Sequence, residues 1–308
     1  MLSFRPVTLS DKNLINSYLK QQHTRLFTYS FEVLFLWRNV YDFQITEFDN
    51  HLLIKTYVDG CHYFLFPVGN DDLIPTLEAM LDHSFCLDCA PVIGQITPEN
   101  REVMERLMPG KFKFIPSRNE YEYLYESEKL ATLSGKALQP KRNHINFVEK
   151  NYSWQFEPIT PENIGECIAF NDAWDYHYND NPESKRFIEN KAINDYFLYY
   201  DKMPLDGGCI RLDGKVAGIS VGTPLNDEVY LCLFEKASHI HRGSYTLINR
   251  EMIRHYAIGY NYVNRAEDGG VEGLRQAKLS YNPAILQEVF LAELADRNVA
   301  ETTETEAI

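Results

Sequence analysis

Long apolar runs are missing from this 308-residue sequence. The longest, such as VLFLW at 33–37 and YFLFPV at 63–68, are far shorter than the roughly 20 residues that cross a bilayer. The first residues, MLSFRPVTLSDKN, lack the charged segment followed by an apolar one that a secretory signal needs. We therefore expect no transmembrane segment and a cytoplasmic protein.

Cysteine and positive charge are scarce as well. The six cysteines, at 61, 86, 89, 167, 209 and 232, lie mostly inside apolar runs without framework spacing, which is typical of buried thiols in a reducing compartment. Lys and Arg number 30 against 44 Asp and Glu, so the net charge is −14. This charge disfavours a broad electrostatic surface for nucleic acid or anionic lipid, although it is compatible with a local basic patch.

A metal site is weakly indicated at one place only. His83, Cys86 and Cys89 have metal-like spacing, but the chain has no second pair of ligands. The stretch FCLDCAPV at 85–92 alternates like a buried strand, so we interpret these residues as structural and expect no metal.

The composition is that of a folded protein, with 44% hydrophobic and 13% aromatic residues, and the length suits two domains of ordinary size or one large one. Two segments begin alike, FRPVTLSDKNLINSYL at 4–19 and FEPITPENIGECIAF at 156–170. Each is typical of a short strand followed by a turn that caps a helix. The similarity indicates an internal duplication, offset by about half the chain.

Each half combines helices with a mostly antiparallel sheet. In the first half, FQITEFDNHLLIKTYVDGCHYFLFPVG predicts consecutive strands with turns at DN and DG, followed by helices at 71–84 and 97–109 and a tyrosine-rich hairpin ending at Tyr125. The second half has helices up to about Tyr200, strands at 207–235, a helix at 244–259, and strands at 260–266 and 288–294. The predicted fold class is α+β in two tandem domains, 1–128 and 153–298, with an acidic disordered tail at 299–308.

A basic connecting segment at 129–152 separates the two halves. Between Lys129 and Lys150 it has five Lys or Arg against one Glu, and Ile145, Val148 and Tyr152 share one helical face. Two interpretations remain open, a solvated helix with one docked face and a ligand-facing helix. Arg142 and His144 are its candidate ligand residues.

The stretch NRAEDGGVEGLRQAKLSYNP at 264–283 concentrates polar residues. A helix at 271–282 would bring Arg275 and Lys278 one turn apart on one face, after Glu267 and Asp268 and before Pro283. Each part also has a structural interpretation, with Asp268 as a cap, Glu272 and Arg275 as a surface pair, and Tyr281 as a core aromatic residue.

A second candidate is the turn Arg242-Gly243-Ser244, which follows a strand and precedes a helix. Glycine lets a phosphate approach the main chain, and the first helical N–H groups point at the anion. The signal is weak, because a glycine before a helix is common. The turn also differs from the Q-x-x-G-x-G/A pattern of coenzyme A users.

The elements PKRNHINFVEKNY, INREM and NRAEDGGVEGLRQAKLSYNP resemble the phosphatidylglycerol lysyltransferase C-terminal domain family. The resemblance implies two tandem acyltransferase domains of the GNAT type. Family members move an aminoacyl group from charged tRNA, and GNAT relatives move acyl groups from acyl-coenzyme A. The positions that match the family's most recognisable stretch are Arg265, Glu267, Asp268, Gly270, Glu272, Gly273, Leu274, Arg275, Lys278, Ser280, Tyr281 and Pro283.

By this resemblance we expect a soluble acyl or aminoacyl transferase that acts on an unknown amine or hydroxyl and holds no permanently bound cofactor. Asp268 or Glu267 would orient or deprotonate the acceptor, and Tyr281 would donate the proton. The main chain of strand VYLCLF would polarise the donor carbonyl. The donor phosphates would be bound by Arg242, Gly243, Ser244, Arg265, Arg275, Lys278, Arg142 and His144. The catalytic residues lie in the second domain, and the first is expected to be non-catalytic. The alternative is a non-catalytic binding module that retains the GNAT-like fold.

Overall fold

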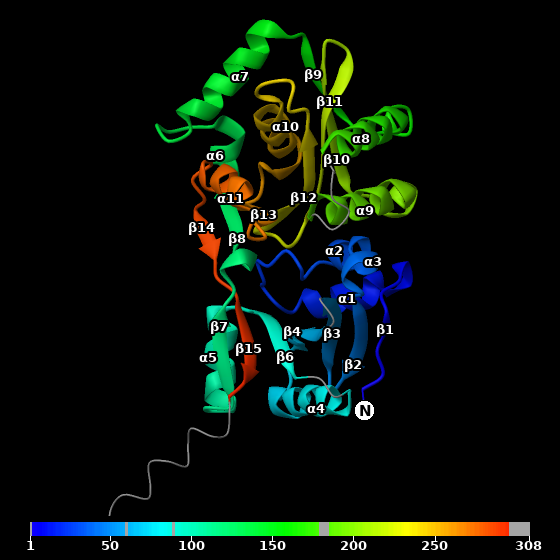
Figure 1. The fold of residues 1–308 in the computed structure, drawn as a ribbon, viewed down its shortest axis with the longest axis vertical. Coiled ribbons are helices and arrows are strands. Elements are labelled where there is room, and N and C mark those ends of the chain that lie inside the picture. The colour runs from blue at the N-terminus through cyan, green and yellow to red at the C-terminus, as the bar shows by residue number, and fades with distance from the viewer. Residues whose placement is uncertain (1, 59–60, 88–89, 179–184, 296–308) are drawn as a thin grey trace, which may run out of the picture. The chain divides into compact units, whose positions relative to one another are not determined.

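The computed structural model describes residues 2–58, 61–87, 90–178 and 185–295, and the chain divides into two compact units (Figure 1). Unit 1 comprises residues 1–6, 41–118 and the stretch from 288, and unit 2 comprises residues 7–40 and 119–287. Each unit is therefore built from stretches that are distant in sequence. The predicted continuous domains do not coincide with these units, and the predicted tail lies outside the described residues.

Unit 1 contains an eight-stranded sheet in which all neighbouring strands are antiparallel except β4 and β6. The predicted turn between β2 and β3 is confirmed, since Asp49 and Asn50 both have positive φ, 47° and 55°, as a two-residue hairpin turn requires. In spatial order the strands are β1 (Arg5–Pro6), β2 (Gln44–Phe48), β3 (His51–Val58), β4 (Cys61–Leu65), β6 (Val92–Ile96), β15 (Phe290–Leu294) and β7 (Phe112–Pro116), with β5 (Val68–Gly69) beside β3.

Two helices, α4 (Leu73–Cys86) and α5 (Pro98–Leu107), contribute to the core of unit 1. α5 begins where the Thr97 hydroxyl accepts a hydrogen bond from the Asn100 main chain at 3.2 Å, with Pro98 in the first turn. Among the described residues, no helix has the length and apolar character to cross a membrane.

Two predictions for the first half are wrong. The strand expected at 85–92 is not formed, because α4 continues to Cys86 and β6 begins only at Val92. A short apolar run fits either structure, and here helical packing prevails. The tyrosine-rich hairpin is also wrong, since β7 belongs to the sheet of unit 1 and β8 (Glu122–Glu126) to that of unit 2. Cys86 is exposed and Cys89 lies outside the described residues; elsewhere in the described chain, no three His, Cys, Asp or Glu side chains form a group suited to a metal.

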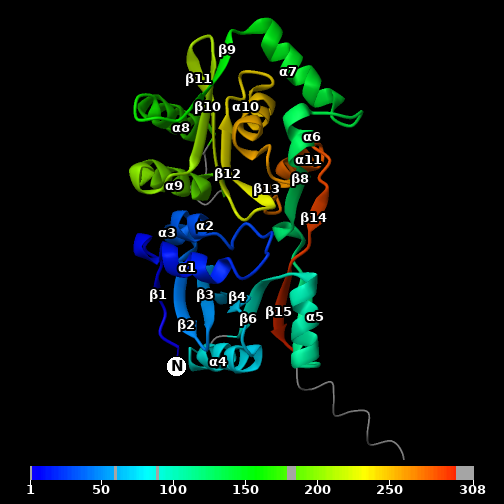
Figure 2. The same ribbon diagram turned by 180° about the vertical axis from the view of Figure 1, so that it is seen from behind.

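Unit 2 contains a seven-stranded sheet with a single parallel pair, β12 and β13. α8 (Ile164–Tyr178) and α9 (Lys185–Leu198) cover one side of this sheet and α10 (Ser244–Met252) covers the other (Figures 1 and 2). In spatial order the strands are β14 (Ile285–Gln287), β8, β13 (Tyr262–Glu267), β12 (Val229–Ala237), β11 (Lys215–Pro224), β10 (Asp206–Leu212) and β9 (Trp154–Pro158). The order of elements predicted for the second half is confirmed through the helix of the 264–283 stretch, α11 (Glu272–Leu279). The final strand also forms, as β15, but it belongs to the sheet of unit 1.

The connecting segment forms two helices of unit 2, α6 (Ser127–Thr132) and α7 (Gln139–Asn151), which join the core together with α10. The predicted docked face is confirmed, because Ile145 and Val148 are buried and Tyr152 packs against the same core. The remaining elements of unit 2 include the short 3-10 helix η1 (Leu9–Asp11), α1 (Lys12–Leu19), α2 (Phe31–Leu36), α3 (Arg38–Tyr41), whose last residue belongs to unit 1, and α11 (Glu272–Leu279).

The two similar segments form matching turns. The Thr8 main-chain N–H donates to the Asp11 carboxylate at 2.8 Å, and the Thr160 N–H donates to the Asn163 side-chain oxygen at 2.8 Å. Both hydrogen bonds span three residues and precede a helix, so the predicted capping turns are confirmed.

Candidate functional site

The strands β12 and β13 separate partway along their length. Their parallel pairing ends at Leu231 and Asn264, whereas β12 continues to Ala237. Beyond this point β12 carries a bulge at Leu233, because Val221 pairs with Phe234 and Gly222 with Cys232. Bulges bend a strand and are frequent beside active sites. Within unit 2, the part of β12 beyond Leu231 is therefore not paired with β13.

A second irregularity lies on β13 at the same level. Its ladder with β8 is interrupted between Asn264 and Glu267, and Ala266 has a φ of +56°. The Asn264 side-chain oxygen accepts the Ala266 N–H at 2.7 Å and so holds this conformation. A left-handed alanine is uncommon and marks a site of local strain. The bulge determines where the preceding side chain, Arg265, points.

Arg265 forms an ion pair with Glu235 of β12. Its Nη2 donates to Glu235 Oε1 at 2.9 Å, and Asn249 of α10 donates through Nδ2 to Glu235 Oε2 at 2.9 Å. The Arg265 guanidinium also lies 4.9 Å from the ring centroid of Tyr281 and 5.8 Å from that of Tyr125, in the range of cation–π contacts. Side chains of β13 and α10 thus both donate to one buried carboxylate of β12.

Lys141 of α7 lies on the same tyrosine. Its Nζ is 3.9 Å from the Tyr281 ring centroid, and burial lowers the pKa of Lys141 to about 8. Burial raises the pKa of Tyr281, so its phenol keeps its proton at neutral pH. The Tyr281 hydroxyl donates weakly, at 3.4 Å, to the Thr246 hydroxyl, which lies 3.2 Å from Nδ1 of His144. We call Lys141, Glu235, Asn249, Arg265 and Tyr281 the polar cluster.

The sequence pointed to two members of this cluster and missed three. Arg265 and Tyr281 were candidates, and His144 lies beside the cluster through Thr246. Lys141, Glu235 and Asn249 were not singled out. Lys141 and Asn249 both lie in motifs that carry the family resemblance, PKRNH and INREM, so those motifs were the available signal.

Asp268 is occupied by other protein groups. It is fully buried and accepts hydrogen bonds from the Tyr123 hydroxyl at 2.6 Å, from two nitrogens of Arg275 at 2.9 Å, and from the Gly270 N–H at 2.8 Å. Burial alone would raise the pKa of Asp268, but these hydrogen bonds, chiefly those from Arg275, outweigh it and hold the pKa below the usual range. A carboxylate stabilised in this way is a poor proton acceptor.

Arg275 and Lys278 also hold protein groups. Arg275 donates to the Asn119 side chain at 2.9 Å in addition to Asp268. The buried Lys278 ammonium donates to the carbonyl oxygens of Arg265 and Ala266, and burial lowers its pKa to about 8. Lys278 therefore supports the β13 bulge, and Arg275 holds Asp268 just after β13. The sequence did not indicate these roles. Glu267 ends β13, where it pairs with β8 at Glu122.

The turn at Arg242 is covered by α7. Gly243 has a φ of +92°, and a Cβ added there would lie 2.7 Å from the His144 carbonyl oxygen and 2.9 Å from Val148. Ser244 is buried and donates its hydroxyl to the Ser238 carbonyl at 2.6 Å. The predicted cradle at the start of α10 therefore faces another helix, and Gly243 is required by close packing.

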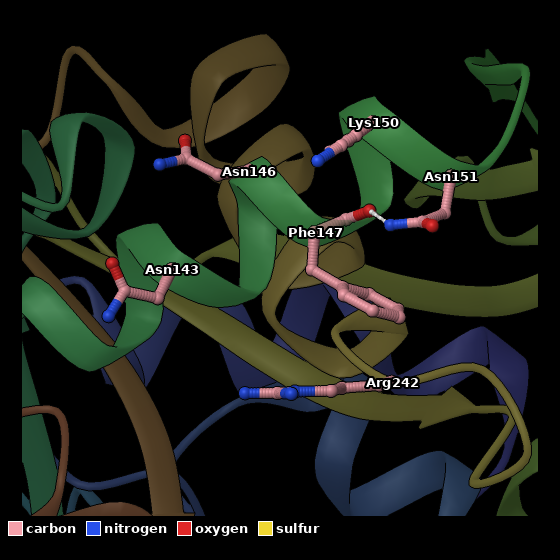
Figure 3. Close-up of a pocket in the computed structure, with 6 residues that line it drawn as sticks. All are labelled: Asn143, Asn146, Phe147, Lys150, Asn151 and Arg242. Atoms are coloured by element: carbon pink, nitrogen blue, oxygen red, sulfur yellow. Dashed lines mark hydrogen bonds between the residues drawn. The ribbon is translucent and has the colours of Figure 1, made fainter.

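Arg242 itself lines an open groove of about 440 Å³ on α7 (Figure 3). The Arg242 guanidinium lies 5.3 Å from the Phe147 ring centroid, below that ring in Figure 3. We call this the α7 groove, and it is lined by Asn143, Asn146, Phe147, Lys150, Asn151 and Arg242. Arg142 is absent from this lining, because its guanidinium donates to the carbonyl oxygens of Leu133 and Gly135 between α6 and α7.

Comparison with known structures defines the class of fold. The tandem GNAT protein from the clavulanic acid biosynthesis pathway matches with a TM-score of 0.50 at 12% identity, over 96% of this chain and 99% of that one. L-PGS from Bacillus licheniformis matches with a TM-score of 0.63 at 15% identity, over 94% and 93%. The α+β fold expected from the sequence, with two tandem GNAT-like domains, is confirmed.

The chain belongs to the family described as phosphatidylglycerol lysyltransferase, C-terminal, whose model matches residues 20–293. A conserved protein of unknown function from Bacteroides thetaiotaomicron shares 32% identity and a TM-score of 0.90, over 96% of this chain and 100% of that one. An uncharacterized protein of Mycoplasmoides gallisepticum is 27% identical over 180 residues, which are 56% of each protein. The chain thus spans little more than half of that relative. Family and fold together indicate an acyltransferase of this type.

Proposed function

We propose that this protein transfers an aminoacyl group from charged tRNA to an amine or hydroxyl acceptor, with the polar cluster of unit 2 as the reaction centre. The observation that carries the choice of donor is the packing of α7 over the start of α10. The free N–H groups of that helix end would be the natural site for the phosphates of coenzyme A. With Gly243 against the His144 carbonyl, an acyl-coenzyme A donor is disfavoured.

The α7 groove has the chemistry of a surface for single-stranded RNA. Lys150 and Arg242 are exposed cations for phosphates, and Phe147 offers a ring on which a base can stack. Amides of three asparagines add donors and acceptors for base edges. Because the chain carries a net charge of −14, RNA would be attracted mainly to such a local basic face.

The cluster supplies the groups that acyl transfer needs. The acceptor nitrogen or oxygen attacks the ester carbonyl carbon, and the bond from that carbon to the tRNA ribose oxygen breaks. Lys141, with a pKa of about 8, takes the proton of the acceptor, and the Tyr281 phenol protonates the departing ribose oxygen. Lys141 then returns its proton to the phenolate. Arg265 and the main chain of β12 beyond Leu231 would stabilise the oxyanion.

The first test compares the two donor classes by the thermal unfolding midpoint, which any ligand that binds the native state raises. We expect a saturating aminoacyl-tRNA to raise the midpoint and a saturating acetyl-coenzyme A to leave it unchanged. A rise with acetyl-coenzyme A that is lost in Arg242→Ala would contradict the proposed donor.

The second test measures transfer directly. Labelled aminoacyl-tRNA is incubated with the protein and either phosphatidylglycerol vesicles or a soluble amine, and the label on each acceptor is counted. We expect discharge faster than the spontaneous hydrolysis of the ester. Tight binding of charged tRNA without any faster discharge would instead favour the alternative, a non-catalytic binding module.

A further inference from the structure

Two buried polar atoms of the cluster lack partners. Within the part of the chain that the structure describes, Arg265 Nη1 and Asn249 Oδ1 have no hydrogen-bond partner, and the Asn249 side chain is almost completely buried. More than nine in ten buried polar groups in folded proteins are hydrogen-bonded, so an exception calls for a ligand or an ordered water. Here one exception is a donor and the other an acceptor.

The orientation of both groups follows from their shared partner. A carboxylate can only accept, so the amide nitrogen of Asn249 must face Glu235 Oε2, which leaves Oδ1 directed elsewhere. In the same way Arg265 donates to Glu235 Oε1 through Nη2, and Nη1 forms the other prong of the guanidinium. The unpartnered donor, Arg265 Nη1, and the unpartnered acceptor, Asn249 Oδ1, therefore belong to two side chains that are both hydrogen-bonded to the Glu235 carboxylate.

We infer that Arg265 and Asn249 recognise the α-amino ester of the donor, with Nη1 donating to the ester carbonyl oxygen and Oδ1 accepting an N–H of the α-amino group. This inference rests on the proposed function. An α-amino ester carries its acceptor and donor on adjacent carbons, which matches one donor and one acceptor held around Glu235. An acetyl thioester has the carbonyl but no amine, so it would leave Asn249 unsatisfied.

The other charged groups of the cluster are compatible with this ligand. Arg265 is cationic and Lys141 is neutral in the form that accepts the proton, so Arg265 favours a neutral amine over an ammonium, and both forms of the amine can donate to Asn249. The Glu235 carboxylate offsets part of this positive charge. An ordered water could also satisfy both atoms, and the experiment must separate that outcome from a ligand.

The test uses two amide-linked probes that differ only in the amino group, 3′-alanylamino-3′-deoxyadenosine and 3′-propionylamino-3′-deoxyadenosine. Neither is cleaved, so calorimetric titration of the full chain reports binding alone. We expect the propionyl probe to bind the wild type at least about tenfold more weakly, since it leaves a buried acceptor unpaired. Equal affinity, or no binding of the alanyl probe, would overturn the inference and leave a water at these atoms.

The variant Asn249→Leu keeps the size of the side chain but removes Oδ1. We expect it to bind the two probes equally, whereas Asn13→Leu, the same change at an exposed position of α1, keeps the tenfold preference. Should Asn249→Leu fail to fold, the difference in affinity of the wild type for the two probes still tests the inference. Continued preference for the alanyl probe in a folded Asn249→Leu protein would contradict the assignment of this residue.

Failure of this inference is distinguishable from failure of the proposed function. If the wild type prefers the alanyl probe but never discharges aminoacyl-tRNA, the recognition site stands and the catalytic proposal falls. If it discharges aminoacyl-tRNA and binds both probes equally, the catalytic proposal stands and the recognition site falls.

Discussion

Arg265 and Glu235 lie on strands that have separated, and their side chains join at 2.9 Å where main-chain pairing has ended. Both are mostly buried, with side-chain exposures of 14% and 8%. The ion pair links β12 to β13 beyond the end of their pairing, and its carboxylate holds both Arg265 and Asn249, the residues that we assign to donor recognition. Its integrity is therefore a condition for any activity of the cluster.

Replacing Glu235 with Gln should destabilise unit 2 strongly. The substitution leaves the Arg265 charge buried without a counter-ion, and breaking such a pair costs about 3–5 kcal/mol. Urea unfolding measures the change. The double variant Glu235→Gln, Arg265→Met removes both charges and should recover part of the loss. If Glu235→Gln alone were as stable as the wild type, the pair would contribute little.

Gly243→Ala tests the packing of α7 on the start of α10. The new Cβ would lie 2.7 Å from the His144 carbonyl oxygen, in addition to the strain of a φ of +92°. Gly135→Ala is the matched control, because its φ is +87° and nothing lies within 4 Å of the added Cβ. We expect the control to lose only the left-handed term of about 1–2 kcal/mol in urea unfolding, and Gly243→Ala to lose more. Equal losses would mean that α7 gives way easily.

The elements that the sequence predicted correctly depend on neighbouring residues. The turn at Asp49-Asn50, the buried face of α7 at Ile145 and Val148, and the caps at Thr8 and Thr160 are all short-range patterns. Such preferences act within a few residues, so they can be predicted from the sequence without knowledge of the fold.

The pairing between strands that are distant in the chain could not be predicted from the sequence. β15 follows unit 2 in sequence but pairs with β6 and β7 of unit 1, and β8 joins β13 and β14. A strand's partner is chosen by tertiary packing across more than 130 residues, which an alternating pattern does not encode.

The candidate site divides in the same way. The residue types in 264–283 were recognised, but their partners were not. Asp268 and Arg275, proposed as base and phosphate ligand, satisfy each other through two hydrogen bonds at 2.9 Å. The spacing of residues in the sequence cannot distinguish a charged side chain that binds a ligand from one that forms an ion pair within the same chain.

Glu122 should make stability depend on pH. Burial raises its pKa to about 8, despite hydrogen bonds from Asn264 and from the Phe27 N–H. Between the ordinary value of 4.5 and about 8 the folded state keeps a proton that the unfolded state has lost. Stability therefore falls as pH rises through this window, by at most about 1.4 kcal/mol per pH unit.

The measurement is urea unfolding of the wild type and Glu122→Gln at several pH values from 5 to 8. The amide cannot ionise, so we expect its stability to change less across this range. Parallel curves for the two proteins would show that Glu122 does not titrate there. Values above pH 8 are excluded because the buried lysines Lys141 and Lys278 titrate in that range.

The α7 groove should determine the salt dependence of tRNA binding. Removing two phosphate contacts with Lys150→Ala and Arg242→Ala should reduce the slope of log K against log salt by about 1.5, since each contact contributes 0.7 to 0.9. The control Lys20→Ala, Lys215→Ala removes the same charge from exposed positions outside the groove. Filter binding at several salt concentrations measures both. Equal slopes for the two double variants would place the RNA elsewhere.

Tyr281→Phe should separate chemistry from folding. The lost hydroxyl makes a long hydrogen bond of 3.4 Å to Thr246, so the unfolding midpoint should change little, whereas the loss of a proton donor should slow aminoacyl-tRNA discharge by about 10²–10⁴-fold. Tyr125→Phe is the matched control, because Tyr125 packs on Tyr281 and its hydroxyl donates to the Lys278 carbonyl at 2.9 Å. That hydrogen bond is structural, so Tyr125→Phe should lower the midpoint and keep the rate. Discharge at the wild-type rate by Tyr281→Phe would remove the phenol from the mechanism and leave Lys141 as the remaining proton carrier of the cluster.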